Sequence, residues 1–165
     1  MTTPVVKPAP SDPGAPLKRS VLFLLPFVVF VLHTLEELPG FAAWATRHFG
    51  PETTNEFVAY HIPLMLLVLL CSWRAMVAER HGGWVVMAIA FQWQFCVNAV
   101  FHLSTWVAFG EYAPGVVIAS VVALPSSVYF FSWVRREDRA TMKEVFLGGV
   151  IGTVVAALAI GFLFL

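Results

Sequence analysis

Residues 21–37 read VLFLLPFVVFVLHTLEE, an apolar run (21–32) that leads directly into the pentad His33-Thr34-Leu35-Glu36-Glu37. Such a run is typical of a membrane-spanning helix, and ionisable residues within a membrane helix are candidates for function. At about 100° per residue, Glu36 lies about 60° to one side of His33 and Glu37 about 40° to the other. The three side chains therefore share one helix face, which indicates a ligand set or an acid–base cluster.

The composition around this stretch is that of an integral membrane protein. Hydrophobic residues make up 59% of the chain and charged residues 12%, against about 45–50% and about 25% in soluble proteins. The formal net charge is zero, and without a long basic block no nucleic-acid partner is expected. Cys71 and Cys96 lie in apolar stretches, which predicts buried thiols with no disulfide framework.

Five stretches are long and apolar enough to span a bilayer, which needs about 20 residues each. They predict an all-α, multi-pass transmembrane helix bundle with spans at roughly 20–45, 57–79, 83–109, 113–134 and 144–165. Residues 1–19 contain five prolines and predict a disordered, Pro-rich cytosolic tail, leaving 20–165 as the bundle. A cleaved secretory signal ending near Ala45 is the rival interpretation, and Glu36, Glu37 and Pro39 disfavour it.

The positive charges predict how the bundle sits in the membrane. Three Lys and Arg residues precede the first span, two belong to the second connection and four to the fourth, so nine of the ten share one side if all five stretches span. The positive-inside rule then places the N-terminus inside, the C-terminus outside and the protein in the cell inner (plasma) membrane. In the last span, Gly148 and Gly152 form a small-xxx-small pair that indicates helix packing or a homo-oligomer.

With this orientation, polar residues from three spans fall into one layer. Counting about 1.5 Å per residue, His33 lies about 20 Å above the inner surface and the two glutamates of the pentad about 25 Å above it. The same count places Asn98 at about 23 Å and His102 at about 29 Å, with His61 about one turn below the outer surface. The sequence therefore predicts a polar cluster in the outer half of the bilayer.

The third span presents Gln94, Asn98 and His102 at i, i+4 and i+8, along one helix face. A single Asn or His in a membrane helix is usually an interhelical hydrogen bond. Two adjacent carboxylates differ, because they need compensation from cations, protons or a metal. The whole set therefore favours a functional site over simple packing.

Two further motifs give the chain a resemblance to a known family. Asn98-Ala99-Val100-Phe101-His102 lies on a later apolar helix, and Tyr112-Ala113-Pro114-Gly115 opens the next span. With the pentad, in this order, they resemble the bacterial HXXEE family of small integral membrane proteins, from about residue 20 to 134. That family is uncharacterised, so the resemblance implies only an activity carried by its polar residues. Tyr112 is added through this resemblance as a residue that binds substrate or supports the ligands.

The first functional hypothesis is a metal-dependent membrane enzyme, a hydrolase or an oxidoreductase, that acts on a lipophilic or amphipathic small molecule. Imidazole and carboxylate ligands suit a divalent metal, with zinc or iron as first candidates. Glu36 and Glu37 are the expected catalytic residues, and Gln94 and Asn98 orient ligands or substrate. The expected metal ligands are His33, Glu36, Glu37 and His102, with His61 added from its depth alone.

Two alternatives remain open. A metal-free isomerase or cyclase would use one protonated carboxyl of Glu36 and Glu37 as acid and the other as base. A non-enzymatic metal-ion or proton transporter would use the same residues as part of a path. Towards the inner face, however, the sequence offers only five polar residues, which favours a pocket over a path: Gln92, Gln94, Ser120, Ser126 and Ser127.

Overall fold

The computed structural model describes residues 20–164, and the predicted tail 1–19 lies outside this part of the chain. The described residues form helices with no strand. In chain order these are the 3-10 helix η1 (Val21–Leu24), α2 (Leu25–Glu37), α3 (Phe41–His48), α4 (Thr54–Ala78), α5 (Gly83–Phe109), the π-helix η2 (Ile118–Ala123), α6 (Leu124–Arg136) and α7 (Met142–Phe162).

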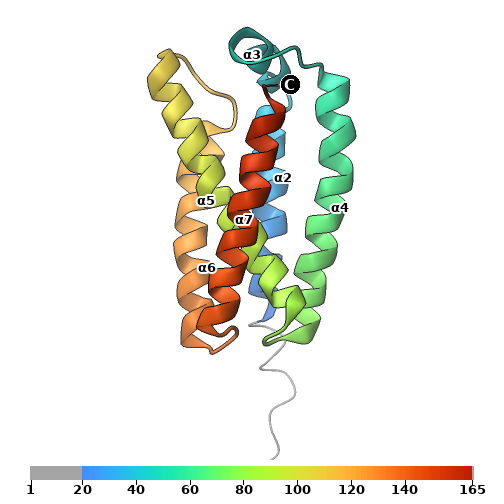
Figure 1. The fold of residues 1–165 in the computed structure, drawn as a ribbon, viewed down its shortest axis with the longest axis vertical. Helices are drawn as coiled ribbons and strands as arrows, with labels where there is room; N and C mark the ends of the chain where they lie inside the picture. Colours follow the sequence, from blue (N-terminus) through green and yellow to red (C-terminus); the bar gives the residue numbers. More distant parts are fainter. Residues whose placement is uncertain (1–19, 165) are drawn as a thin grey trace, which may run out of the picture.

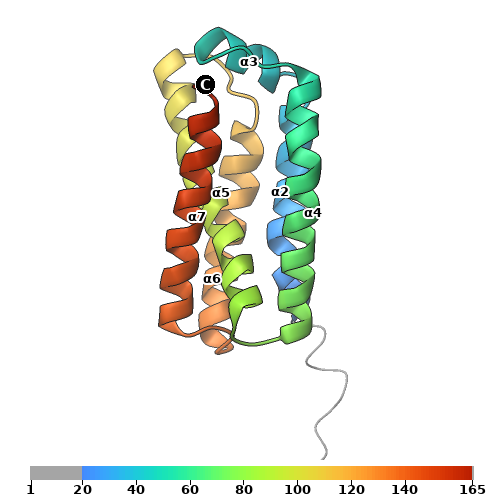
Figure 2. The same cartoon turned by 45° about the vertical axis from the view of Figure 1, so that its right-hand side comes forward.

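The helices confirm the predicted class, an all-α multi-pass bundle. Four of them are long and apolar enough to cross a membrane: α4, α5, the continuous pair Ile118–Arg136, and α7. A fifth candidate is the pair Val21–Glu37 and Phe41–His48, which is bent by 72°. The helices run side by side, while α3 lies across one end, where the chain also ends (Figures 1 and 2). We call this the α3 end.

The oblique helix α5 is the centre of the bundle. It packs most extensively against α7 and also contacts α2, α4, α6 and η2. The α5–α7 contact explains the Gly148 and Gly152 spacing, because a Cβ at either position would lie under 3.0 Å from atoms of Ile89 or Ala90 on α5. The two glycines are therefore buried within one chain, and a second copy would have to bind elsewhere.

The predicted first span, 20–45, is not a single helix. Helix α2 ends at Glu37, and α3 begins at Phe41 in a new direction. The sequence between them contains Pro39 and Gly40; proline lacks the N–H that a helix interior needs, and glycine adopts turns readily. Because of this break, α2 ends at the last residue of the pentad, Glu37, and α3 crosses the end of the bundle above it.

Local sequence signals also fix the ends of the other helices that carry the site. Thr53 and Glu56 form a reciprocal capping box that starts α4, which satisfies two N–H groups that a helix start leaves without intrahelical partners. Gly110 ends α5 in the left-handed region, at φ 65°, which glycine adopts without a Cβ clash. The π-helix η2 precedes Pro125, where a wider turn accommodates the missing N–H and the proline ring.

The opposite end of the bundle is tied by a buried arginine. Arg139 is 4% exposed; its Nη1 donates to the Ser20 hydroxyl at 3.2 Å and to the Glu79 carbonyl at 3.0 Å. Its guanidinium also lies 5.4 Å from the ring centre of Trp133. We call these residues the arginine tie, because they join the start of the first helix to the α4–α5 and α6–α7 connections.

Candidate metal centre

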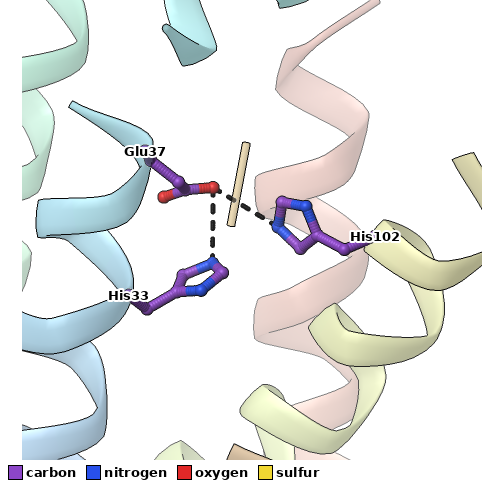
Figure 3. Close-up of side chains that lie close together, drawn as sticks. All are labelled: His33, Glu37 and His102. Atoms are coloured by element: carbon purple, nitrogen blue, oxygen red, sulfur yellow. Dashed lines mark ion pairs between the residues drawn. The ribbon is translucent and has the colours of Figure 1, made fainter. Parts of the chain in front are cut away.

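Three buried ionisable side chains meet at the α3 end. His33 and Glu37 come from the last turns of α2 and His102 from α5, and they are 3%, 5% and 1% exposed. The Glu37 Oε1 atom lies 3.3 Å from Nε2 of His33 and 3.3 Å from Nε2 of His102, with both rings turned towards it (Figure 3). We call these residues the triad, and their ligand atoms lie close enough to hold one metal ion.

The triad distances fit shared ligation better than direct hydrogen bonding. A charge-assisted N–H···O bond is usually about 2.7–2.9 Å long, shorter than the 3.3 Å measured twice here. Two ligands bound tetrahedrally to zinc, each about 2.0–2.1 Å from the ion, lie about 3.3–3.4 Å apart. The carboxylate oxygen and each imidazole nitrogen are therefore spaced like neighbouring ligands of one ion.

His61 on α4 brings a third imidazole to the same carboxylate. Its Nε2 lies 3.8 Å from Glu37 Oε2, and its ring stacks on Phe57 with centres 3.9 Å apart. Its Nδ1 is 2.8 Å from the Phe57 carbonyl, which only accepts, so Nδ1 carries a proton and Nε2 is left to face Glu37. A hydrogen bond at the far nitrogen is the usual way in which proteins orient a ligating histidine.

Asn98 contacts the triad through His33. Its side-chain Nδ2 lies 2.8 Å from His33 Nε2, and because an amide NH₂ group only donates, this imidazole nitrogen accepts. The same imidazole nitrogen thus faces both the Asn98 amide, at 2.8 Å, and Glu37 Oε1, at 3.3 Å.

The adjacent carboxylate, Glu36, lies apart from the triad. Its Oε1 accepts from the Tyr112 hydroxyl at 2.6 Å and from the Val117 N–H at 2.9 Å, and its Oε2 accepts from the Ile118 N–H at 2.6 Å. Glu36 thus caps the helical segment that leads into η2. Burial and the Glu36 carboxylate raise the pKa of Tyr112 to about 12, so the phenol remains a donor at neutral pH.

Gly115 is a site residue to which the sequence motifs gave no role. A Cβ at this position would lie 2.7 Å from Cε1 of both His33 and His102, and its φ is +98°. The chain therefore needs glycine here for its backbone angle and for the space between the two imidazoles. The signal in the sequence was the Pro114-Gly115 turn pair, which is visible without the structure but does not reveal what packs against it.

Gln94, a predicted orienting residue, does not join the site. Its backbone N–H lies on the α7 side of α5, near Gly152, and among the described residues its side chain makes no hydrogen bond to the triad. Eight residues on a helix turn through about 80°, so Gln94 and His102 diverge although each is one i+4 step from Asn98. The neighbouring Gln92 instead donates to Ser127 at 2.7 Å.

A hollow of about 370 Å³ opens at the α3 end, and its lining includes Glu36 but no side chain of the triad. Its walls come from the end of α2, from α3 and from the connection that follows α5. The lining residues combine polar and apolar groups: Glu36, Pro39, Gly40, Ala43, Trp44, Arg47, Tyr112 and Pro114. The hollow has the size of a small-molecule site, typically about 300–1,000 Å³.

Helix α3 is held over this end by contacts on both of its faces. Phe41 packs on Phe57 and faces the ring of His102, with ring centres 5.6 and 6.3 Å apart. Outside, Glu111 lies 2.8 Å from His48 Nε2 and 2.9 Å from Arg47 Nη2. The hydrogen bond to His48, and the one to Arg47, lower the pKa of Glu111. These contacts cover the triad from the end of the bundle.

Comparison with known proteins identifies the family. The family described as a protein of unknown function with HXXEE motif matches residues 24–130, which is more than half of the 165-residue chain. The chain therefore belongs to the HXXEE family. No significant match is found among curated proteins or among solved structures.

Proposed function

We propose that the triad binds one divalent transition metal and that the protein is a metal-dependent membrane enzyme acting on an amphipathic small molecule. The observation that carries this proposal is the pair of 3.3 Å distances from one buried carboxylate oxygen to two histidine Nε2 atoms. A carboxylate buried in an apolar bundle needs a compensating charge. Three ligand atoms converging on one point favour a metal ion as that charge.

The ligand types narrow the metal and the chemistry. Two imidazoles and a carboxylate suit zinc, iron or manganese and disfavour copper(I), which prefers sulfur ligands. Three protein ligands, as in catalytic zinc sites, leave a position for water or substrate. Such a metal, when bound, would act as a Lewis acid or redox centre. His61 Nε2, facing Glu37 Oε2 across 3.8 Å, is then a fourth ligand or the group that accepts a proton.

The hollow at the α3 end supports a substrate with both polar and apolar parts. Pro39, Ala43 and Pro114 offer apolar walls, while Tyr112 and Arg47 are polar. Glu36, which shares a helix turn with Glu37, links this hollow to the ligand-bearing end of α2. A molecule entering from the membrane surface would place its polar part near the triad and its apolar part along α3.

The layer beneath the triad favours a closed pocket over a transport path. It consists of apolar side chains from three helices, α2, α4 and α5: Val29, Phe30, Val68, Phe91 and Phe95. Phe95 meets the edge of the His33 ring, with centres 6.3 Å apart, and Phe30 lies beside His61 at 5.7 Å. An ion leaving the triad towards the other end would have to cross this layer without ligands.

One observation supports a second candidate, a metal-free acid–base enzyme. In the described structure Asn98 Nδ2 bonds to His33 Nε2, so the nitrogen that would bind a metal already has a partner. In this alternative, Glu37 and His102 exchange protons with a lipophilic substrate. The two candidates differ in whether the folded, active protein contains metal.

The proposal is tested by metal analysis of the detergent-purified chain together with a turnover screen. We expect one equivalent of a single transition metal in the wild type and none in Glu37→Gln. Gln94→Ala removes a polar membrane residue outside the triad, His81→Ala removes a histidine outside it, and both should keep the metal. A folded wild type without metal would contradict the proposal.

The same samples then report activity. We expect the metal-loaded wild type, but not Glu37→Gln, either to hydrolyse nitrophenyl esters of medium-length fatty acids or, with iron, to consume dioxygen with amphipathic alcohols. Turnover by a metal-free wild type would support the acid–base alternative. A bound metal with no difference between the two proteins across both screens would reduce the proposal to metal binding.

A further inference from the structure

The two adjacent glutamates of the pentad face different partners. Glu37 points into the triad, while Glu36 accepts three hydrogen bonds from the segment 112–118, all between 2.6 and 2.9 Å. Two of the donors are backbone N–H groups at the start of a helix, where the helix dipole also favours a negative charge. Glu36 therefore fixes this segment relative to α2.

The same segment forms one wall of the triad. Gly115 lies three residues after Tyr112 and two before Val117, between residues that Glu36 binds. Its Cα lies so close to both imidazoles that an added Cβ would be 2.7 Å from His33 Cε1, 2.7 Å from His102 Cε1 and 3.0 Å from His102 Nε2. The backbone at Gly115 is therefore a spacer between the two histidine rings.

We infer that Glu36 is a positioning residue: by holding the segment 112–118 against α2, it sets the Gly115 backbone between His33 and His102 and so fixes the spacing of the two imidazoles. This inference rests on the proposed metal function for its consequence, which is ligand geometry. It assigns different roles to the two glutamates, Glu37 as a ligand and Glu36 as the anchor of the wall between the other two ligands.

Helix capping alone would not produce this consequence. A cap that only stabilised the start of the helix would change the free energy of unfolding when removed and leave the metal environment unchanged. Removal of a positioning residue changes the geometry of the metal site, while the number of metal ions bound per chain stays the same. Removal of Glu36 and insertion of a methyl group at Gly115 should then produce the same spectroscopic change, because both displace the same backbone.

Cobalt(II) is the probe, because its visible absorption reports ligand geometry. The full-length chain in detergent is titrated with Co²⁺ as wild type, Glu36→Gln, Glu36→Ala, Gly115→Ala and Glu37→Gln. The matched control is Glu52→Gln, because Glu52 also accepts a tyrosine hydroxyl, that of Tyr60 at 2.5 Å, but does not contact the segment 112–118.

We expect Glu36→Ala and Gly115→Ala to bind one equivalent of Co²⁺ at saturation, with affinity at least tenfold weaker and a shifted spectrum. Glu36→Gln, which keeps part of the acceptor set, should lie between them and the wild type, and Glu52→Gln should match the wild type. Wild-type affinity and spectrum in folded Glu36→Ala would overturn the inference. So would complete loss of Co²⁺ in Glu36→Ala with normal binding in Gly115→Ala, which would make Glu36 a ligand.

A measurement without metal separates this inference from the proposed function. In the metal-free protein we expect Glu36→Gln to shift the ¹H–¹³C resonances of the Cε1 groups of His33 and His102, against which Gly115 packs, and unchanged resonances would overturn the inference. A wild type that binds no Co²⁺ would overturn the metal proposal alone. If Glu36→Ala does not fold, Tyr112→Phe can replace it, because it removes one of the three hydrogen bonds to Glu36. We expect Tyr112→Phe to weaken Co²⁺ binding and to shift the Cε1 resonances in the same direction as Glu36→Gln, but by less.

Discussion

The two ends of the bundle bury charged side chains in different ways. At one end, the arginine tie pairs a single cation with two neutral acceptors at 3.0 and 3.2 Å, with the Glu137 carboxylate at 3.7 Å and with the face of Trp133. At the α3 end, a carboxylate meets three imidazoles at 3.3, 3.3 and 3.8 Å. Hydrogen bonds hold Arg139 in place, whereas the triad side chains meet at the longer ion-pair distance of 3.3 Å.

The unpaired atoms sharpen this difference. Among the described residues, Nδ1 of His33 and Nδ1 of His102 are buried without a hydrogen-bond partner, and so is Arg139 Nε. Arg139 keeps two hydrogen bonds through the same guanidinium, so its role is satisfied within the chain. The triad and His61 make four groups that face one another, and Asn98 adds one hydrogen bond, to His33. The arginine tie is therefore complete within the chain, whereas the triad is the part of the bundle to which the proposed function assigns a metal ion.

The largest expected effect is on metal binding at the triad, with no change at the arginine tie. Glu37→Gln removes the carboxylate ligand, so we expect bound metal to fall from one equivalent to none, measured by mass spectrometry. A variant that keeps its metal would show that Glu37 is not a ligand.

The converse change breaks the arginine tie. Arg139→Met leaves the Glu79 carbonyl and the Ser20 hydroxyl without this donor, which should lower the free energy of unfolding by about 1–3 kcal/mol. Metal content should stay at one equivalent, since the tie lies at the other end of the bundle. Thermal unfolding in detergent, combined with metal analysis, checks both parts. Loss of metal at unchanged stability would refute the separation of the two ends.

A smaller effect is expected at His61. This histidine lies further from Glu37 than the other two, so His61→Ala should weaken metal binding by about 10–100-fold, as is typical for a residue that supports the ligands. The stoichiometry at saturation should remain one. Competition with a chelator measures the affinity, and Gln94→Ala serves as the control. A complete loss of metal would place His61 among the obligatory ligands.

The smallest expected effect is at the outer surface of α3. His48 and Arg47 lower the folded-state pKa of Glu111 below its ordinary value of 4.5. The contribution of this cluster to stability is therefore present above about pH 4.5 and is lost as the pH falls through the lowered pKa. We expect the unfolding temperatures of wild type and Glu111→Gln to differ slightly at pH 6 and to converge as the pH falls below 4.5. A difference that grows on acidification would contradict this sign.

The sequence predicted the helical bundle and the layer of polar residues well, because both depend on patterns within single helices. Long apolar runs indicate spans, and counting residues along each span placed His33, His61 and His102 in the same layer of the membrane. The different directions of Glu36 and Glu37 could not be predicted in this way. Both lie near the same helix face, and what separates them is the segment 112–118, which is distant in the sequence.

The break after α2 lay within reach of sequence reasoning. Pro39 and Gly40 together signal the end of a helix, but the apolar residues on both sides favoured a single span. For Gln94, by contrast, the i, i+4, i+8 pattern was too coarse, because the rotation accumulated over two steps carries its backbone towards α7. Contacts between helices thus determine which polar side chains reach the triad, and these contacts cannot be read from the pattern within one helix.

The most direct test of the central claim is X-ray absorption spectroscopy at the edge of the metal bound to the purified wild-type protein. The account predicts one metal ion with two imidazole nitrogens and a carboxylate oxygen, at about 2.0–2.2 Å if the metal is zinc, and loss of the signal in Glu37→Gln. A metal surrounded by oxygen alone, with no imidazole scattering, would contradict ligation by His33 and His102 and with it the proposed centre.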